Sequence, residues 1–424
     1  MPTPPMLACP ECDLLHQVSG APAGTVQVCA RCGAELGHGG PADLDKELAL
    51  TVTALVLFVL AQAFPLLSLD LHGTAREASI AGCVRILSAL GWPWLSAILL
   101  TTVVLGPLIY LAGMAVVLAQ AARRRPRPWT ARLFRVLEEF RRWDMVEVFV
   151  LGILVSYAKL ARMAAVHPGL ALFALGGFVL AEDLALSRLD SRAVWEAVGP
   201  GGGPDPGRAS GVAGGPPGAR AGISARQADL QACLTCGLVL DLAHPGPCPR
   251  CHAVLHSRRP DSAGRAWALL ATSAILYLPA NLLPVTQVLS LGRPHEDTIL
   301  GGVDYFLRTG SWPLAVVIFV ASVLVPLGKF VVLSFLLLSV RFRSRWRPRL
   351  RTGLYRLTEN VGKWSMVDIF AITLMVAMLP AGGLASVVPR PGAMAFALMV
   401  AATILAVRCY DPRLVWDALE SPHE

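Results

Sequence analysis

Apolar residues along this chain gather in eight long segments that are separated by polar or basic stretches. The segments run near residues 47–69, 93–121, 145–166, 169–187, 266–289, 312–340, 365–385 and 391–409. A helix needs about 20 apolar residues to cross the hydrocarbon core of a bilayer, and most of these segments reach that length. The pattern therefore predicts an α-helical polytopic membrane protein.

The second half of the chain repeats the first. VLGPLIYL at 104–111 matches VLVPLGKF at 323–330, and RWDMVEVF at 142–149 matches KWSMVDIF at 363–370. Such matches lie 219 to 221 residues apart, so they share one register. With four helices in each half, we expect parallel repeats related by an axis along the membrane normal.

This repeat predicts five parts in chain order. A zinc-ribbon-like module at 1–41 precedes a four-helix transmembrane module at 42–198. A linker at 199–225 is rich in Gly and Pro and has almost no apolar bulk, which is typical of a tether. A second zinc-ribbon-like module at 226–260 and a second four-helix module at 261–420 complete the chain.

Composition agrees with a membrane protein. Hydrophobic residues make up 54% of the chain and charged residues 16%, whereas a soluble domain carries about a quarter charged residues. The hydrophobic excess excludes an ordinary soluble enzyme and a disordered protein, and we do not expect an enzyme.

The net charge is +8, and its distribution predicts orientation. Arg residues collect in the loops at 123–142 and 341–363, beside apolar segments. Basic loops face the cytoplasm, so we expect both termini and the ribbon-like modules there, and no nucleic-acid partner.

Eight of the ten cysteines form C-x-x-C pairs, and the eight are Cys9, Cys12, Cys29, Cys32, Cys233, Cys236, Cys248 and Cys251. Two such pairs supply four thiolates, which suit a tetrahedral ion. Soft thiolate ligands favour zinc, with iron as the weaker competitor, so we expect two structural zinc ions. The rival interpretations are disulfides, which a reducing compartment disfavours, and a redox dithiol, which normally starts a helix in a βαβ unit.

Charged side chains at bilayer depth are costly, so each is a candidate functional residue. Lys329 is the clearest, since it stands in 312–340 three residues after Pro326. Asp368 is its expected partner, with Ser365 one turn earlier on the same face and Thr403 on the last helix. We predict a transport or proton-relay cluster here. The competing interpretations are a neutralised pair that only fixes packing and an Asp368 wetted by headgroups.

The matching positions of the first half differ. Tyr110 stands where the second half has Lys329, and Asp144 where it has Ser365. Acids persist at Glu147 and Glu182, which are secondary candidates. The other secondary candidates, polar or helix-bending residues of the second half, are Asn281, Pro284 and Pro326.

Duplicated C-x-x-C modules, each followed by four helices, together with the strings VLVPLGKF and KWSMVDIF, resemble the paraquat-inducible protein A family. The resemblance covers nearly the whole chain except the linker and the N-terminal tip. It implies a protein of the bacterial inner membrane that exchanges phospholipid with a periplasmic MCE-type lipid carrier, a tunnel between the two membranes.

The functional prediction is thus an inner-membrane subunit of an MCE-type lipid transport system, coupled to protons through Lys329 and Asp368. No G-x-x-x-x-G-K-[ST] string is present, so another energy source than bound ATP is needed. The alternative is a scaffold that anchors and orients a periplasmic partner without transporting. A redox enzyme or sensor that uses the C-x-x-C pairs is a weaker third hypothesis.

Overall fold

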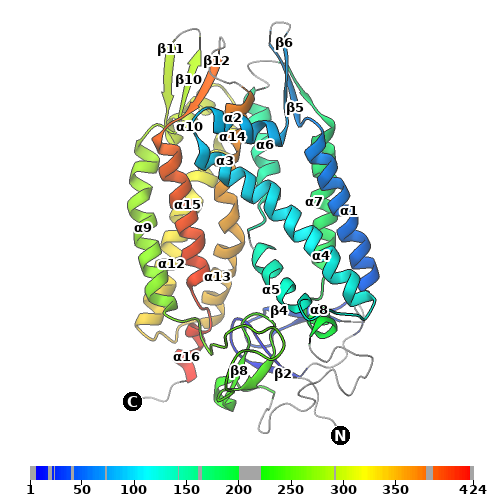
Figure 1. The fold of residues 1–424 in the computed structure, drawn as a ribbon. Coiled ribbons are helices and arrows are strands. Elements are labelled where there is room, and N and C mark those ends of the chain that lie inside the picture. The colour runs from blue at the N-terminus through cyan, green and yellow to red at the C-terminus, as the bar shows by residue number, and fades with distance from the viewer. Residues whose placement is uncertain are drawn as a thin grey trace.

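The computed structural model describes residues 6–17, 22, 24–39, 43–71, 74–141, 143–160, 165–199, 221–290, 293–378 and 385–420. Most of the linker at 199–225 lies outside the described residues. Helices form an elongated bundle with small β-sheets at both ends, and the N- and C-termini lie at the same end (Figure 1). All eight apolar segments contain a helix, as the sequence predicted.

In the first membrane region (residues 42–198), the basic stretch at 123–142 contains an amphipathic helix, α5. Helix α1 packs against both α4 and α7, while α5 crosses below α4 (Figure 1). Its helices are α1 (Leu44–Ala63), α2 (Ile80–Ala89), α3 (Pro93–Leu99), η1 (Leu100–Leu105), α4 (Gly106–Ala122), α5 (Thr130–Arg141), α6 (Val146–Leu160), α7 (Leu170–Arg188) and α8 (Ser191–Val198).

The second membrane region (residues 261–420) follows the same order of elements. Helix α9 packs along α15, and α12 contacts both (Figure 1). Its helices are α9 (Ser262–Leu282), α10 (Ile299–Arg308), α11 (Trp312–Phe319), η3 (Val320–Leu324), α12 (Val325–Arg341), α13 (Pro348–Gly362), η4 (Lys363–Met366), α14 (Val367–Met378), α15 (Pro391–Cys409) and α16 (Leu414–Glu420).

Each region ends, away from the termini, in a three-stranded antiparallel sheet. Strand β5 (Leu67–Leu71) lies between β6 (Thr74–Ala78) and β7 (Ala165–Pro168), and β10 (Thr286–Ser290) lies between β11 (Arg293–Asp297) and β12 (Ala385–Pro389). The predicted spans were therefore too long at this end, since α1 and α9 stop well before residues 69 and 289. Pro65 and Pro284 follow two residues after the helix ends and cannot continue the hydrogen-bond ladder.

Proline inside the long helices is accommodated without a break. The α3–η1–α4 helix contains Pro107 and the α11–η3–α12 helix contains Pro326, each just after a π-helical turn. Proline lacks an amide proton, and a π-turn, with hydrogen bonds between residues five apart, helps to satisfy the carbonyl groups that this leaves free. Such turns are frequent at functional sites. The predicted disturbance at Pro326 is thus a local widening of the helix.

Helices α6 and α14 join the two regions. Ser156 on α6 donates a hydrogen bond to the carbonyl oxygen of Ala371 at 3.0 Å, and the rings of Phe149 and Phe370 meet edge to face with centroids 5.6 Å apart. Gly152 allows this approach, because a Cβ there would lie 2.8 Å from the Cβ of Phe370. The core of the molecule therefore runs through both regions.

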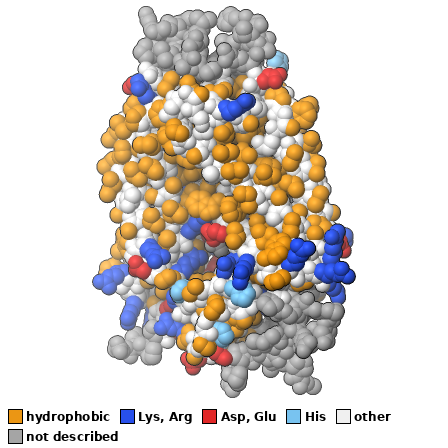
Figure 2. Space-filling model, in the orientation of Figure 1, with side chains coloured by type: hydrophobic (Ala, Val, Ile, Leu, Met, Phe, Trp, Pro, Cys, Tyr) orange, Lys and Arg blue, Asp and Glu red, His pale blue; other side chains and the backbone are white. Residues whose placement is uncertain are grey.

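The surface carries a broad apolar belt over the long helices, with Lys and Arg side chains gathered beneath it on the side of the termini (Figure 2). Five helices in the described part of the chain are long and apolar enough to cross a bilayer: Pro93–Ala122, Leu170–Arg188, Ala315–Arg341, Pro348–Met378 and Pro391–Glu420. The chain is a polytopic membrane protein.

Two small ribbons lie below this belt. The first ribbon (residues 6–39) contains β1 (Met6–Ala8), β2 (Leu15–Gln17), β3 (Val26–Val28) and β4 (Glu35–His38). The second ribbon (residues 221–256) contains η2 (Arg226–Ala228), β8 (Leu230–Ala232) and β9 (Val239–Asp241). Ala8 and Leu15 of the first ribbon share a small core with Leu230 and Val239 of the second.

Candidate functional site

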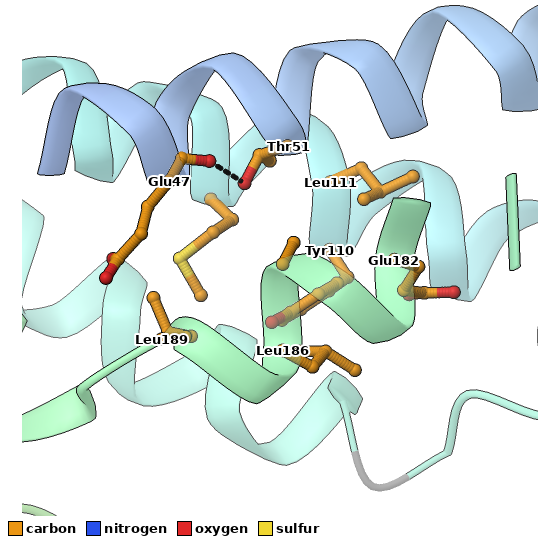
Figure 3. A pocket seen from close by; sticks show the side chains of 9 residues that line it. Glu47, Thr51, Tyr110, Leu111, Glu182, Leu186 and Leu189 are labelled. Carbon is orange, nitrogen blue, oxygen red and sulfur yellow. Dashed lines mark hydrogen bonds between the residues drawn. The ribbon is translucent and has the colours of Figure 1, made fainter. Parts of the chain in front are cut away.

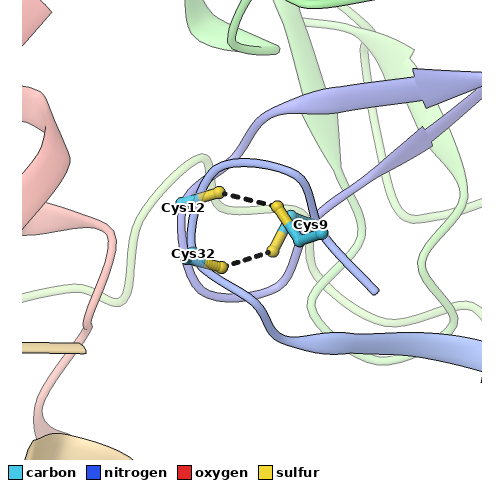
Figure 4. Close-up of side chains that lie close together, drawn as sticks. Cys9, Cys12 and Cys32 are labelled. Carbon is cyan, nitrogen blue, oxygen red and sulfur yellow. Dashed lines mark hydrogen bonds between the residues drawn. The ribbon is translucent and has the colours of Figure 1, made fainter. Parts of the chain in front are cut away.

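The eight predicted ligands form two separate four-cysteine clusters. In the first ribbon the sulfur atoms of Cys9 and Cys32 are 3.5 Å apart, as are those of Cys12 and Cys29 (Figure 4). The second ribbon pairs Cys233 with Cys251 and Cys236 with Cys248 at the same 3.5 Å separation. Within each cluster the four sulfur atoms lie within 4.8 Å of one another, and all eight cysteines are buried.

This geometry fits a tetrahedral metal ion. A zinc–sulfur bond of about 2.3 Å places tetrahedral ligands roughly 3.8 Å apart, close to the observed separations. A disulfide would bring two sulfur atoms to about 2.05 Å, and all ten cysteines, each within the described residues, are free thiols. Four cysteine ligands can fill a tetrahedron, so each cluster can hold a metal ion without leaving an open position on it.

Tight turns hold the ligands. Gly33 and Gly237 each follow a C-x-x-C pair with φ of 74° and 69°, the left-handed region that glycine adopts without strain. Their amides donate to the carbonyl oxygens of Cys29 at 2.8 Å and Cys233 at 3.0 Å, respectively.

His16 has a contact that the sequence did not suggest. Its Nε2 lies 3.2 Å from Sγ of Cys29, one of the four predicted ligands of the first cluster. A ring N–H beside a thiolate sulfur spreads part of its charge and orients the ligand. Leu240 follows Cys233 by the same seven residues that separate His16 from Cys9, so the second ribbon has no imidazole at this position.

Asp13, next to Cys12, is another buried group of the first ribbon. Its carboxylate lies 2.9 Å from the guanidinium of Arg258 and 3.6 Å from that of Arg413. Burial raises the pKa of the Asp13 carboxyl, and the positive charges of the two arginines oppose the rise. Asp13 thus ties the first ribbon to the segment before α9 through Arg258 and to the second membrane region through Arg413.

Lys329 is 4% exposed on α12, twelve residues before Arg341 and so ~18 Å along the helix from the basic loop. Its Nζ donates to the carbonyl oxygen of Gly362 and to Oγ of Ser365, both at 2.9 Å. Both acceptors are neutral. The structure therefore brings together Lys329 and Ser365, two of the four residues predicted for this cluster.

Asp368 and Thr403 lie in the same interior. Asp368 is 9% exposed in the first turn of α14, one turn after Ser365. Thr403 on α15 is buried and donates to the carbonyl oxygen of Val400 at 2.7 Å, while η4, which carries Ser365, packs against α15. Because the described hydrogen bonds of Lys329 go to Gly362 and Ser365, the direct pairing with Asp368 stays a prediction.

Asn281 and Pro284 lie at the opposite end of the second region. The side-chain amide nitrogen of Asn281 donates to the carbonyl oxygen of Tyr277 at 2.9 Å. The carbonyl oxygen of Pro284 accepts from the amide of Gly392 at 3.1 Å, which ties the end of α9 to the start of α15. These contacts account for both residues through packing, and their role in transport stays a prediction.

The first region has Tyr110 at the position of Lys329, and two buried acids lie beside it. Glu182 on α7 and Glu47 on α1 are each 4% exposed, and with Tyr110 they line a cavity of about 10 Å³, the size of one water (Figure 3). One carboxylate oxygen of each acid has no hydrogen-bond partner among the described residues. Sequence reasoning found Glu182 but missed Glu47, which it placed at the edge of a span.

Two further acids of the first region, Glu147 and Asp144, lie at the start of α6. Glu147 is exposed at the start of α6. Asp144, which matches Ser365 in sequence, accepts a hydrogen bond from the amide of Val146 at 3.1 Å and so caps α6. The ammonium site of the second region therefore has no equivalent in the described first region.

Comparison with known proteins finds relatives that match nearly the whole chain. The family model described as paraquat-inducible protein A matches residues 44–199 and again residues 264–420. The intermembrane transport protein PqiA of Escherichia coli K12 is 32% identical over 419 residues, which cover 99% of this chain and 97% of that protein.

Two further relatives have similar coverage. The lipophilic envelope-spanning tunnel protein A of Escherichia coli K12 is 31% identical over 97% of this chain and 91% of its own length. A probable intermembrane transport protein of Haemophilus influenzae is 26% identical over 97% of this chain and 95% of its own length. No solved structure matches the chain.

Proposed function

This chain belongs to the paraquat-inducible protein A family, and on that premise we propose that it passes lipid between the inner membrane and a periplasmic MCE-type tunnel. Relatives named for intermembrane transport and for an envelope-spanning tunnel support a place in such a system. The chain transports rather than catalyses, and its metal clusters hold two structural zinc ions. Both termini and both ribbons face the cytoplasm, as the basic loops favour.

The membrane part consists of two parallel four-helix modules. The order of elements and the double match to the family model support this duplication. The second module carries the working site, because the first has Tyr110 in place of Lys329.

The observation that carries the proposal is the environment of Lys329. An ammonium inside an apolar bundle is costly unless it is paired or functional. Here its described hydrogen bonds go to a carbonyl oxygen and a hydroxyl, and neither group is charged. A neutral amine would keep both contacts, since the hydroxyl of Ser365 can turn from acceptor to donor.

Both described hydrogen-bond partners can therefore serve Lys329 in either protonation state. Partners that accept both protonation states suit a residue that gains and loses a proton, whereas a purely structural ion pair does not need them. We propose that proton exchange between Lys329 and Asp368, through Ser365, biases the opening of the second module. Thr403 completes the polar path on α15.

The test uses the chain together with its periplasmic partner in a double-membraned bacterium grown with radioactive phosphate. A photoreactive residue in the partner's tunnel captures phospholipid, and co-purification of the two proteins is measured in parallel. We expect Lys329→Met and Asp368→Asn to reduce labelled lipid to the level seen without this chain while the complex stays intact. Lys46→Met is the matched control, because that side chain is 73% exposed.

Two results would overturn the proposal. If both substitutions leave lipid capture unchanged, the buried charges do not drive transport. If lipid capture changes only with loss of co-purification, the chain is a scaffold that orients its partner.

A further inference from the structure

The two ribbons pack on the membrane regions of opposite halves. The cysteines of the first ribbon share a hydrophobic cluster with Tyr410, Val415 and Trp416 of the second region. The cysteines of the second ribbon belong to the core that contains Phe134 and Trp195 of the first region. The cysteine cluster of each half thus packs against the other half. Other parts of the ribbons also touch their own half, as Leu36 does with Arg192 and Ser224 with Glu420.

In each half, an arginine at the equivalent position of the repeat contacts the four-cysteine cluster of the other half. Arg356 on α13 donates to the carbonyl oxygen of Cys32 at 2.6 Å, and Arg135 on α5 donates to that of Cys251 at 3.3 Å. The two arginines are 221 residues apart, the offset of the RWDM and KWSM matches. Cys32 and Cys251 are the last ligands of their clusters, so the two contacts are equivalent and both are crossed.

The contact of the first ribbon is the more extensive. Nε of Arg356 also lies 2.9 and 2.7 Å from the two carboxylate oxygens of Glu11, which stands inside the first C-x-x-C pair. Arg349, two turns earlier on α13, donates to the carbonyl oxygens of Ala30 at 3.1 Å and Arg31 at 2.7 Å. Charged donors make stronger hydrogen bonds than neutral ones, and their geometry depends on the turn that the cysteines impose.

Helix α13 connects this contact to the buried ammonium. Six residues after Arg356 comes Gly362, whose carbonyl oxygen accepts the hydrogen bond of Lys329 at 2.9 Å. Ser365 follows three residues later on η4. A change at the first cluster that releases Arg356 therefore acts on the segment that holds both acceptors of Lys329.

We propose that each four-cysteine cluster orders the membrane region of the opposite half, with Arg356 and Arg135 as the positioning residues. The first ribbon fixes α13 and with it the Lys329 site, and the second ribbon fixes α5. This inference rests on metal binding by the clusters and not on lipid transport, so the two can fail separately.

Hydrogen exchange of the full chain in lipid nanodiscs tests the crossing. We expect Cys12→Ser to raise amide exchange in α13 (Pro348–Gly362) by about tenfold or more and to leave α5 (Thr130–Arg141) unchanged. Cys236→Ser produces the opposite pattern. Cys409→Ser is the matched control, since Cys409 belongs to neither cluster.

Arginine variants keep the test decisive if a cysteine variant does not fold. Arg356→Ala retains every ligand, and we expect both metals to stay bound while exchange rises in α13 alone; Arg135→Ala affects α5 alone. Arg356→Lys restores part of the protection, because an ammonium still reaches a carbonyl oxygen. The proposal would be overturned if amide exchange rose in the helix of the same half, rose equally in both helices, or changed in neither.

Discussion

Ser365 accepts a hydrogen bond from Lys329 across two helices, with 2.9 Å between Oγ and Nζ, inside an otherwise apolar bundle. Substitution of Lys329 can distinguish a transport role from a role in helix packing. Replacing Lys329 by Met keeps the length of the side chain and removes the burial of a charge, so we expect an unchanged or higher melting temperature in detergent and loss of transport. A lower melting temperature would instead show that the ammonium stabilises the fold.

Ser365→Ala removes one of two hydrogen-bond acceptors from a buried ammonium. We expect a loss of about 1–3 kcal/mol in unfolding free energy, measured by thermal or denaturant melting. In the Lys329→Met background the same change should cost little, because no ammonium is left unsatisfied. Ser322→Ala is the matched control: Ser322 is equally buried near the same helix, and its hydroxyl has no hydrogen-bond partner among the described residues. If Ser365→Ala lowers the unfolding free energy equally with Lys329 and with Met at that position, Ser365 does not stabilise the Lys329 ammonium.

The clusters predict the metal content of the purified protein. We expect two zinc ions per chain by elemental analysis, and one ion after Cys29→Ser or Cys248→Ser. Since cysteine thiols must lose their protons to bind metal, we expect acidification to release the ions together with the ribbon structure. Chains with iron in place of zinc would correct the identity of the metal, and oxidised pairs without metal would support a redox role.

Local signals in the sequence were sufficient for the helices and the metal clusters. C-x-x-C spacing fixes which thiolates can meet, and a run of apolar residues fixes a membrane helix, so neither depends on distant parts of the chain. Cys9 and Cys32 accordingly lie where predicted.

Contacts between distant segments could not be predicted in this way. Strand β5 pairs with β7 about a hundred residues later, and Arg356 reaches a ribbon more than three hundred residues before it. Their partners are selected by tertiary packing rather than by spacing. Lys329 was predicted because a charged residue within an apolar segment is easily recognised. Its acceptor at Gly362 is a backbone oxygen, which every residue has, so the sequence could not identify it.

Gly152 lies where α6 and α14 approach closely, so its substitution tests how strongly the two membrane regions are joined. A Cβ at this position would meet the Cβ of Phe370 at 2.8 Å and the backbone nitrogen of Ala371 at 3.2 Å, and backbone cannot rotate aside as a flexible side chain can. Gly152→Ala should therefore push α6 and α14 apart, lengthen the hydrogen bond from Ser156 to Ala371, and cost about 1–3 kcal/mol in melting experiments. Gly176→Ala is the matched control, because nothing lies within 4 Å of its added Cβ and alanine favours helix. If both variants melt alike, the α6–α14 contact does not hold the two regions together.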